Sequence, residues 1–345
     1  MSKSKRKRIN REAERRAAEV QAVESVWSGK RIIITVSIIF AIIVAIIIGI
    51  NHYFSEDQKY LRIDVISVDG ELISMDYFVR RSFASGSDPM GTLTNMTREM
   101  VLKKEAEAAG IEISPEAVEN KLIEMASGEG EPITQSEFKE WFRQRLNDTK
   151  LSDDEYRDIV ATQLIGEFFY DVIADATPNT AEQVHLHVIL TDTEEQAEET
   201  RARWAAGESF ADLAREVSLD ATSRENGGDV GWVPRGVIYD SRYDDVIFNL
   251  DIGDVSELLA YYDTSAADPS SPSYINYYLM MVSDKSDLRE IDEKYLDTVH
   301  DMAFDQWISL MLSEHDIQYH GIKNGFDSET YAWINWQLQK LIGNK

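Results

Sequence analysis

The amino-acid sequence predicts an α+β protein with a single N-terminal transmembrane helix, a helical domain, a smaller domain built on a β-sheet, and C-terminal helices. Three observations carry this prediction. Residues 32–50 contain no charged side chain, and residues 63–174 contain several helix-start signals followed by apolar residues at helical spacing. Residues 184–282 then run in the order strand, two helices, glycine-rich turn, short helix and two strands. A chain of 345 residues with 43% apolar content is long enough for two or three folded units.

Charge is distributed unevenly along the chain. Residues 1–31 hold ten Lys or Arg and four Asp or Glu, a net charge of +6, whereas the rest of the chain carries a net charge of −33. Because the acidic bulk would repel phosphates and anionic headgroups, we expect no nucleic-acid partner. The absence of cysteine excludes disulfides, a thiolate nucleophile and cysteine-ligated zinc.

The boundary between the basic and acidic parts is the run IIITVSIIFAIIVAIIIGI, residues 32–50. As a helix it rises roughly 28 Å, enough to cross the hydrocarbon core of a bilayer. The positive-inside rule makes residues 1–31 a cytoplasmic tail and puts everything beyond Asn51 outside the cytoplasm. We therefore expect an uncleaved, single-pass signal anchor. A cleaved signal peptide is the alternative, which the length of the run and the lack of a small-residue cleavage site after Ile50 disfavour.

Residues 55–176 are expected to form the helical domain. VISVDGELIS alternates apolar and polar residues around Asp69-Gly70, which predicts a β-hairpin. Later helices begin at N-capping residues, two of them with a glutamate three positions on: Ser74, Ser114, Thr134 with Glu137, and Ser152 with Glu155. The apolar stripes of these helices are typical of packing, so no chemistry is assigned to them.

The stretch ENGGDVGWVPRG, residues 225–236, holds four of the eighteen glycines of the chain. Gly227, Gly228 and Gly231 permit positive φ angles and close approach of the backbone, so we expect the chain to leave the helices here and pass under the sheet while Trp232 covers the turn. A phosphate-binding loop is the competing interpretation. No lysine follows at P-loop spacing and Asp229 would repel an anion, which excludes a nucleotide site.

Residues 182–284 resemble the parvulin family of peptidyl-prolyl isomerases, also called the PpiC or rotamase type, as found in the bacterial SurA and PrsA chaperones. VHLHVIL is similar to the family's SHILV strand, GESFADLAREVSLDATS to its two-helix segment, NGGDVGW to its most recognisable motif, and RYDDVIFNLDIGDVSELL to its third helix and the following turn. The preceding region, through VDGELIS and AEAAGIEISPEAVENKL, is more loosely similar to the SurA-type N-terminal chaperone domain. The resemblance implies a four-stranded antiparallel sheet with surrounding helices and a cofactor-free peptidyl-prolyl cis-trans isomerase.

The resemblance also implies which residues are catalytic. His187 corresponds to the first histidine of the family, and Asp220 corresponds to its cysteine or aspartate position. Tyr278 stands where the second histidine is expected, because this chain has NYYLMMV in place of GYHIIKV. A tyrosine hydroxyl can still donate a hydrogen bond, so these three residues are the candidate catalytic set.

The proline-binding residues implied by the resemblance are Val230, Ile238, Tyr243 and Phe248. Each is equally well explained as ordinary core of a small domain. A metal site is a separate possibility at His185 and His187, which lie on the same face of one strand. The sequence shows no third ligand for that pair, so no metal is expected.

Residues 290–345 predict C-terminal amphipathic helices with a short strand between them. In SurA-like chaperones a C-terminal segment returns to complete the N-terminal domain. The alternative is a helical cap on the isomerase domain. A membrane-docking helix is less favoured, because its polar face has no excess of Lys or Arg.

Together these features predict a foldase held in a bacterial cell membrane and facing outward. Its partners would be unfolded or proline-containing exported polypeptides. The tyrosine at the second-histidine position keeps a second class open, a noncatalytic holdase chaperone with a degenerate parvulin domain. A structural or sensor protein of a membrane complex is the third class, and the oligomeric state stays open.

The charge asymmetry generates a first prediction. Protease added to intact cells should digest the region beyond Asn51, because the acidic bulk lies outside the membrane and the basic tail inside. The digestion is followed with antibodies against the tail and against the bulk. Protection of the bulk would contradict the orientation.

Overall fold

The computed structural model describes residues 3–128, 132–238, 241–262, 275–323 and 325–343, and it shows the mixed helix and sheet architecture expected from the sequence. The chain divides into two compact units. One consists of Met1–Leu93 with Ile317–Lys345, and the other of Thr94–Asp316. The ends of the chain therefore belong to the same unit, and the candidate isomerase domain lies wholly within the other.

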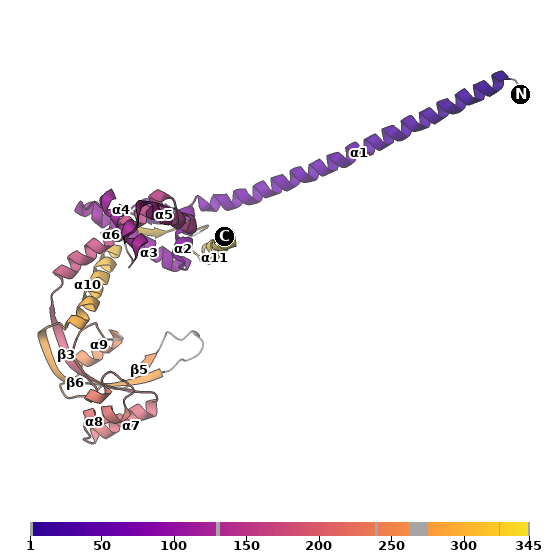
Figure 1. Cartoon of the computed structure of the whole chain (residues 1–345). Coiled ribbons are helices and arrows are strands. Elements are labelled where there is room, and N and C mark those ends of the chain that lie inside the picture. The colour runs from indigo at the N-terminus through magenta and orange to yellow at the C-terminus, as the bar shows by residue number, and fades with distance from the viewer. Residues whose placement is uncertain (1–2, 129–131, 239–240, 263–274, 324, 344–345) are drawn as a thin grey trace. The chain divides into compact units, whose positions relative to one another are not determined.

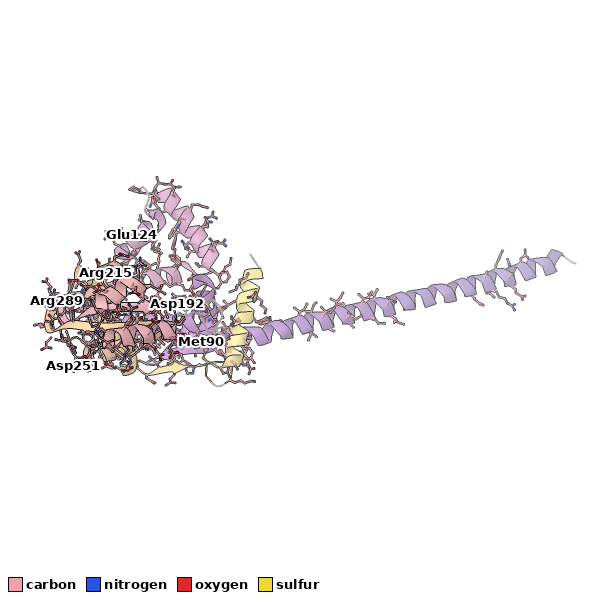
Figure 2. The ribbon with its side chains drawn as sticks, turned by 90° about the horizontal axis from the view of Figure 1, so that it is seen from below. Met90, Glu124, Asp192, Arg215, Asp251 and Arg289 are labelled. Atoms are coloured by element: carbon pink, nitrogen blue, oxygen red, sulfur yellow. The ribbon has the colours of Figure 1, made fainter. Side chains whose placement is uncertain are left out.

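The first unit begins with one continuous helix, α1 (Lys3–Leu61). Its section Ile34–Asn51 has a mean hydropathy of 2.8 and no buried residue. In Figure 2 the side chains of this section stand out from the helix with no other element against them. By length and composition it can cross a membrane, and a signal sequence near an N-terminus has the same properties.

A small sheet and two helices complete the first unit. Asp69 and Gly70 have φ angles of 50° and 82°, the pair of positive values that a tight hairpin turn requires, so the predicted hairpin is confirmed. A strand from the C-terminal segment pairs antiparallel with the first strand of this hairpin, giving the order β2-β1-β7. The elements are β1 (Asp64–Val68), β2 (Glu71–Ser74), α2 (Met75–Ser85), β7 (Ile317–Tyr319) and α11 (Ser328–Gly343).

The helices of the second unit begin where the sequence predicts. The side chains of Ser114, Thr134 and Ser152 accept hydrogen bonds from the backbone three residues on, and the last two form complete capping boxes. The helices before the sheet are α3 (Pro89–Ala109), which begins in the first unit, α4 (Pro115–Ser127), α5 (Gln135–Thr149) and α6 (Asp153–Ala176).

Helix α6 lies beside α10 (Glu293–Glu314), as Figure 1 shows. The Tyr170 hydroxyl donates a hydrogen bond to Oδ1 of Asp301 at 2.9 Å, and the Phe169 and Trp307 rings are 4.8 Å apart. Helix α6 leads into the first long strand of the large sheet, and the last strand leads into α10. The pair of helices therefore continues directly into the pair of strands.

The large sheet has four strands in the order β4-β3-β6-β5, and all neighbours are antiparallel. This is the sheet that the parvulin resemblance implies. Its strands are β3 (Thr180–Thr191), β4 (Asp229–Pro234), β5 (Leu259–Tyr262) and β6 (Ile275–Glu290). The connecting helices are α7 (Glu194–Ala205), α8 (Phe210–Val217), the short 3-10 helix η1 (Arg224–Asn226) and α9 (Ser241–Asn249).

The central strand β3 is covered on both faces. Successive side chains of a strand point to opposite faces, so two different cores form along it. On one face Leu186 and Val188 pack with residues of β6 and α9: Met280, Val282, Ile247 and Phe248. On the other face Ile189 packs against α8 and β6 through Phe210, Leu213 and Leu279.

Of the three register shifts that interrupt the pairing of β3, two are bulges beside its histidines. In the β4 pairing Leu186 lies opposite Gly231 and His187 opposite Asp229, so Val230 is an extra residue without a partner on β3. In the β6 pairing Ser283 is the corresponding extra residue. Both bulges lie at the middle of the sheet, beside the two histidines of β3.

The glycine-rich turn connects η1 to β4 and passes close to the backbone of β3. Gly227 and Gly228 have φ angles of 74° and 79°. A Cβ atom on Gly228 would lie 2.4 Å from the carbonyl oxygen of Val188, and the Val188 N–H donates a hydrogen bond of 2.8 Å to the Gly228 carbonyl. The backbone of the turn therefore approaches β3 too closely for any side chain, as the sequence indicates.

This contact generates a second prediction, which compares two glycines with similar φ angles. Gly228→Ala should reduce the free energy of unfolding by about 1–3 kcal/mol more than Gly231→Ala, because only the first substitution forces an atom into the Val188 carbonyl. Gly231 has a φ of 86° but nothing within 4 Å of its Cβ position. Chemical denaturation measures the free energy of unfolding of both variants. Equal losses would show that the positive φ angle alone, and not the contact with Val188, makes glycine necessary in this turn.

Candidate functional site

A cavity of about 270 Å³ opens on the face of the sheet where Leu186 and Val188 lie. Its walls come from β3, the loop after α8, β4 with the segment after it, β6 and α10. The lining is mostly aliphatic, with a few polar groups: Leu186, Val188, Asp220, Thr222, Val230, Val233, Val237, Ile238, Tyr278, Met280, Lys294, Tyr295 and Thr298.

Four of the candidate site residues meet at this cavity, namely Asp220, Val230, Ile238 and Tyr278. Val230 is the bulge residue of β4. The other two residues implied as proline-binding, Tyr243 and Phe248, are buried in the core beside the cavity and do not line it. The Tyr243 ring lies 6.3 Å from the Tyr278 ring, so it supports the wall from behind.

The structure does not bring His187 to this cavity. Its neighbours on β3, Leu186 and Val188, line the cavity, so alternation turns His187 to the opposite face. There its ring contacts Phe210 of α8, and its Nε2 atom lies 3.0 Å from Oγ of Ser283. The expected grouping of His187 with Asp220 and Tyr278 is therefore not formed, and none of the described lining residues is a histidine.

Helix α10 contributes three lining residues that the sequence does not reveal: Lys294, Tyr295 and Thr298. Farther along α10, Met302 packs against the loop after β4, where a Cβ atom on Gly236 would overlap its side chain. Amphipathic spacing predicts this helix, but nothing in the pattern says which surface it covers. The cavity is therefore closed by a segment outside the parvulin-like region.

Asp220 is held within its own loop. Its carboxylate accepts hydrogen bonds from the Ser223 hydroxyl and from the backbone N–H and hydroxyl of Thr222. Burial alone would raise the pKa of Asp220, but the hydrogen bonds from Ser223 and Thr222 outweigh burial and lower it. Asp220 therefore places a negative charge at the cavity, which Lys294 also lines.

The two histidines form a second polar cluster on the opposite face. Nε2 of His185 lies 2.9 Å from Oδ1 of Asp229, and the two histidine rings are 5.3 Å apart. Burial lowers the pKa of His187, partly offset by the negative charge of Asp229. The sequence left this pair without a third polar partner, and the β4 bulge supplies Asp229.

A larger groove of about 550 Å³ lies on the helices and away from the cavity. It is open and mainly apolar, and residues of α3, α6 and α10 line it, among them Leu102, Ile159, Gly166, Tyr170 and Phe304. No candidate catalytic residue lies there. Its lining also includes Glu99, Glu167 and Asp171.

Comparison with known families places a PPIC-type PPIase domain, also called a rotamase domain, at residues 189–264. The matched stretch includes Asp220 and Val230, whereas His187 and Tyr278 lie outside it.

Comparison with individual proteins finds several called foldase protein PrsA. The one from Halalkalibacterium halodurans is 34% identical over 118 residues, which is 34% of this chain and 32% of that protein. The one from a Geobacillus species is 24% identical over 261 residues, 72% of this chain and 81% of that protein. The first match thus spans about a third of its relative's length.

Among solved structures, a peptidylprolyl isomerase (PrsA) from Bacillus anthracis has 17% identity and a TM-score of 0.37, over 72% of this chain and 97% of that one. The foldase protein PrsA from Streptococcus pneumoniae has 17% identity and a TM-score of 0.34, over 81% of this chain and 94% of that one.

The family match and the four-stranded antiparallel sheet agree with the resemblance seen in the sequence. The chain therefore carries a parvulin-type (PPIC-type) PPIase domain, matched at residues 189–264, and is similar to proteins called foldase protein PrsA.

Proposed function

We propose that this protein is a peptidyl-prolyl cis-trans isomerase that assists the folding of exported polypeptides from the outer side of the cell membrane. The observation that carries the proposal is the small, mostly aliphatic cavity between the parvulin-type domain and α10. Its volume of about 270 Å³ lies just below the range of ~300–1,000 Å³ typical of sites for drug-sized ligands. That size suits a single proline ring.

The proposed mechanism needs no covalent bond and no cofactor. Rotation about an X-Pro bond has a barrier of ~18–20 kcal/mol, because amide resonance must be broken. A twisted amide carries less charge separation than a planar one, so removal of water favours the twisted form. The aliphatic walls formed by Val188, Val230 and Ile238 would hold the proline ring and exclude water.

Polar groups at the cavity would then act on the rotating amide. Tyr278 can donate a hydrogen bond through its phenol group, and it lies opposite Leu190 in the β3–β6 pairing, on the cavity face. The Asp220 carboxylate is occupied by Ser223 and Thr222, so we assign it to the shape and charge of the wall. Binding the twisted amide better than either planar form would lower the barrier.

The anchor and the charge of the chain support the proposed location. The apolar section of α1 is long enough to span the bilayer, and the basic tail precedes it. A foldase tethered there would meet polypeptides as they leave the membrane. Its clients would be unfolded or proline-containing exported chains.

The helices would hold the client while the cavity acts on a proline. The groove on α3, α6 and α10 is mainly apolar, and α6 also exposes Phe168 and Val172 with 43% and 49% of their surface accessible. Exposed apolar side chains close to a groove are typical of surfaces that bind other chains. This surface supports a chaperone role that is separate from catalysis.

The cavity generates a third prediction, on the fragment comprising residues 54–345. Tyr278→Phe should lower kcat/KM on a proline peptide by about two- to tenfold, because one hydrogen bond to the rotating amide is lost. Val230→Phe should lower it further, because the larger ring fills the cavity. His187→Ala should change turnover less than either, because its ring lies on the opposite face of β3. A protease-coupled or magnetisation-exchange assay measures the rates.

Unfolding curves of the three variants serve as the control for folding. A folded His187→Ala protein that loses more activity than Tyr278→Phe would place the reactive centre on the histidine face. If the unmodified fragment binds proline peptides but isomerises them no faster than the uncatalysed rate, the noncatalytic holdase becomes the favoured function.

The exposed surface of α6 generates a fourth prediction. The fragment should suppress aggregation of a denatured client, and Phe168→Ser with Val172→Ser should weaken this effect because the apolar area is removed. Light scattering measures aggregation, and isomerase turnover should stay unchanged in the same variant. Suppression that survives this double substitution but disappears in Val230→Phe would move client holding to the cavity.

A further inference from the structure

The histidine face of β3 carries a set of side chains that the proposed isomerase cavity does not use. His185, His187 and Asp229 each offer one ligand atom, and these three atoms lie within 4.8 Å of one another. All three side chains are partly accessible, with 30% of the His185 side chain and 38% of the Asp229 side chain exposed. The cluster is therefore built into the sheet, and its side chains are partly exposed to solvent.

We propose that His185, His187 and Asp229 form a binding site for a divalent transition-metal ion of the zinc type. Two imidazoles and one carboxylate are the donors that such ions prefer, whereas Ca²⁺ and Mg²⁺ prefer sites made of oxygen atoms. A tetrahedral zinc ion with bonds of ~2.0–2.2 Å holds its ligands about 3.3–3.5 Å apart. The three ligand atoms need only a small inward movement to reach that spacing.

The partners around His187 indicate which nitrogen is available. Ser283 donates its hydroxyl hydrogen to the carbonyl of His185, so its Oγ accepts a hydrogen bond from Nε2–H of His187. The other nitrogen of this ring, Nδ1, is buried, and the ring also interacts with the backbone of Gly227. Ser283 belongs to β6 and Asp229 to β4, on opposite sides of β3, so a metal bond from Nδ1 would leave the hydrogen bond of Nε2 to Ser283 in place.

Surrounding groups hold the other two ligands in place. The Gly231 N–H donates a hydrogen bond of 2.8 Å to Oδ1 of Asp229, which fixes the carboxylate at the bulge. Trp232 stacks on His185 with ring centroids 5.4 Å apart, and the guanidinium of Arg289, labelled in Figure 2, lies 4.5 Å from the Trp232 ring centroid. Such supporting contacts orient metal ligands and raise affinity.

Three protein ligands leave a fourth position for water. An ion here would link β3 to β4 at the bulge, on the face of the sheet away from the isomerase cavity. It would replace the direct contact between His185 and Asp229. The two sites would then share strand β3 without sharing a side chain.

The test measures zinc binding to the full chain in detergent micelles, by calorimetry and by the unfolding temperature. One Zn²⁺ ion should bind per chain and raise the unfolding temperature, and Mg²⁺ should not replace it. His185→Ala and His187→Ala should each weaken zinc binding at least about tenfold. His300→Ala, on α10 and outside the cluster, is the matched control and should bind zinc like the unmodified chain.

Asp229→Asn keeps the shape of the side chain and an oxygen for the Gly231 N–H, so it tests the ligand without removing the bulge. It should also weaken zinc binding at least about tenfold while circular dichroism stays unchanged. Absence of stoichiometric zinc binding would overturn the proposal. Equal zinc affinity in the unmodified chain and in folded Asp229→Asn and His185→Ala would overturn it as well. The contact between His185 and Asp229 would then be only a hydrogen bond between β3 and β4.

Discussion

The alternation of side chains along β3 is the constraint on which the rest of the isomerase domain depends. Because this strand is covered on both faces, each of its residues belongs to one of two separate environments. Leu186 and Val188 form the floor of the proposed proline cavity, and His185 and His187 belong to the polar cluster with Asp229. The bulges at Val230 in β4 and Ser283 in β6 shift the register of these strands against β3 beside the histidines. A shift of one residue would exchange the two sets of side chains.

Features determined by local chemistry follow directly from the sequence. The capping boxes at Thr134 and Ser152, the hairpin turn at Asp69-Gly70 and the glycines of the turn before β4 all depend on residues within a few positions of one another. Their physical reasons are short-range hydrogen bonds and allowed φ angles. The uncharged run of α1 can likewise be recognised in the sequence, because length and hydropathy alone define it.

Features that depend on pairing between distant segments could not be read in the same way. The similarity of VHLHVIL to a family strand indicates that a strand exists, but the face to which His187 turns depends on its register with β6, nearly a hundred residues away. The position of Asp229 beside both histidines depends on a bulge in β4. The contribution of α10 to the cavity depends on packing that amphipathic spacing does not specify. In the structure, the candidate residues Asp220, Val230, Ile238 and Tyr278 lie together because all four line the same cavity.

The pairing of β7 with β1 sets an order on the maturation of this chain. Strand β1 is synthesised early, whereas its neighbour β7 lies about 250 residues later. The whole isomerase domain lies between them and consists of contacts within a continuous segment. Because closing so long a loop is slow, that domain can fold first, while one edge of the N-terminal hairpin stays unpaired until β7 has been synthesised. The N-terminal sheet can therefore be completed only after the segment that contains the isomerase domain has been synthesised.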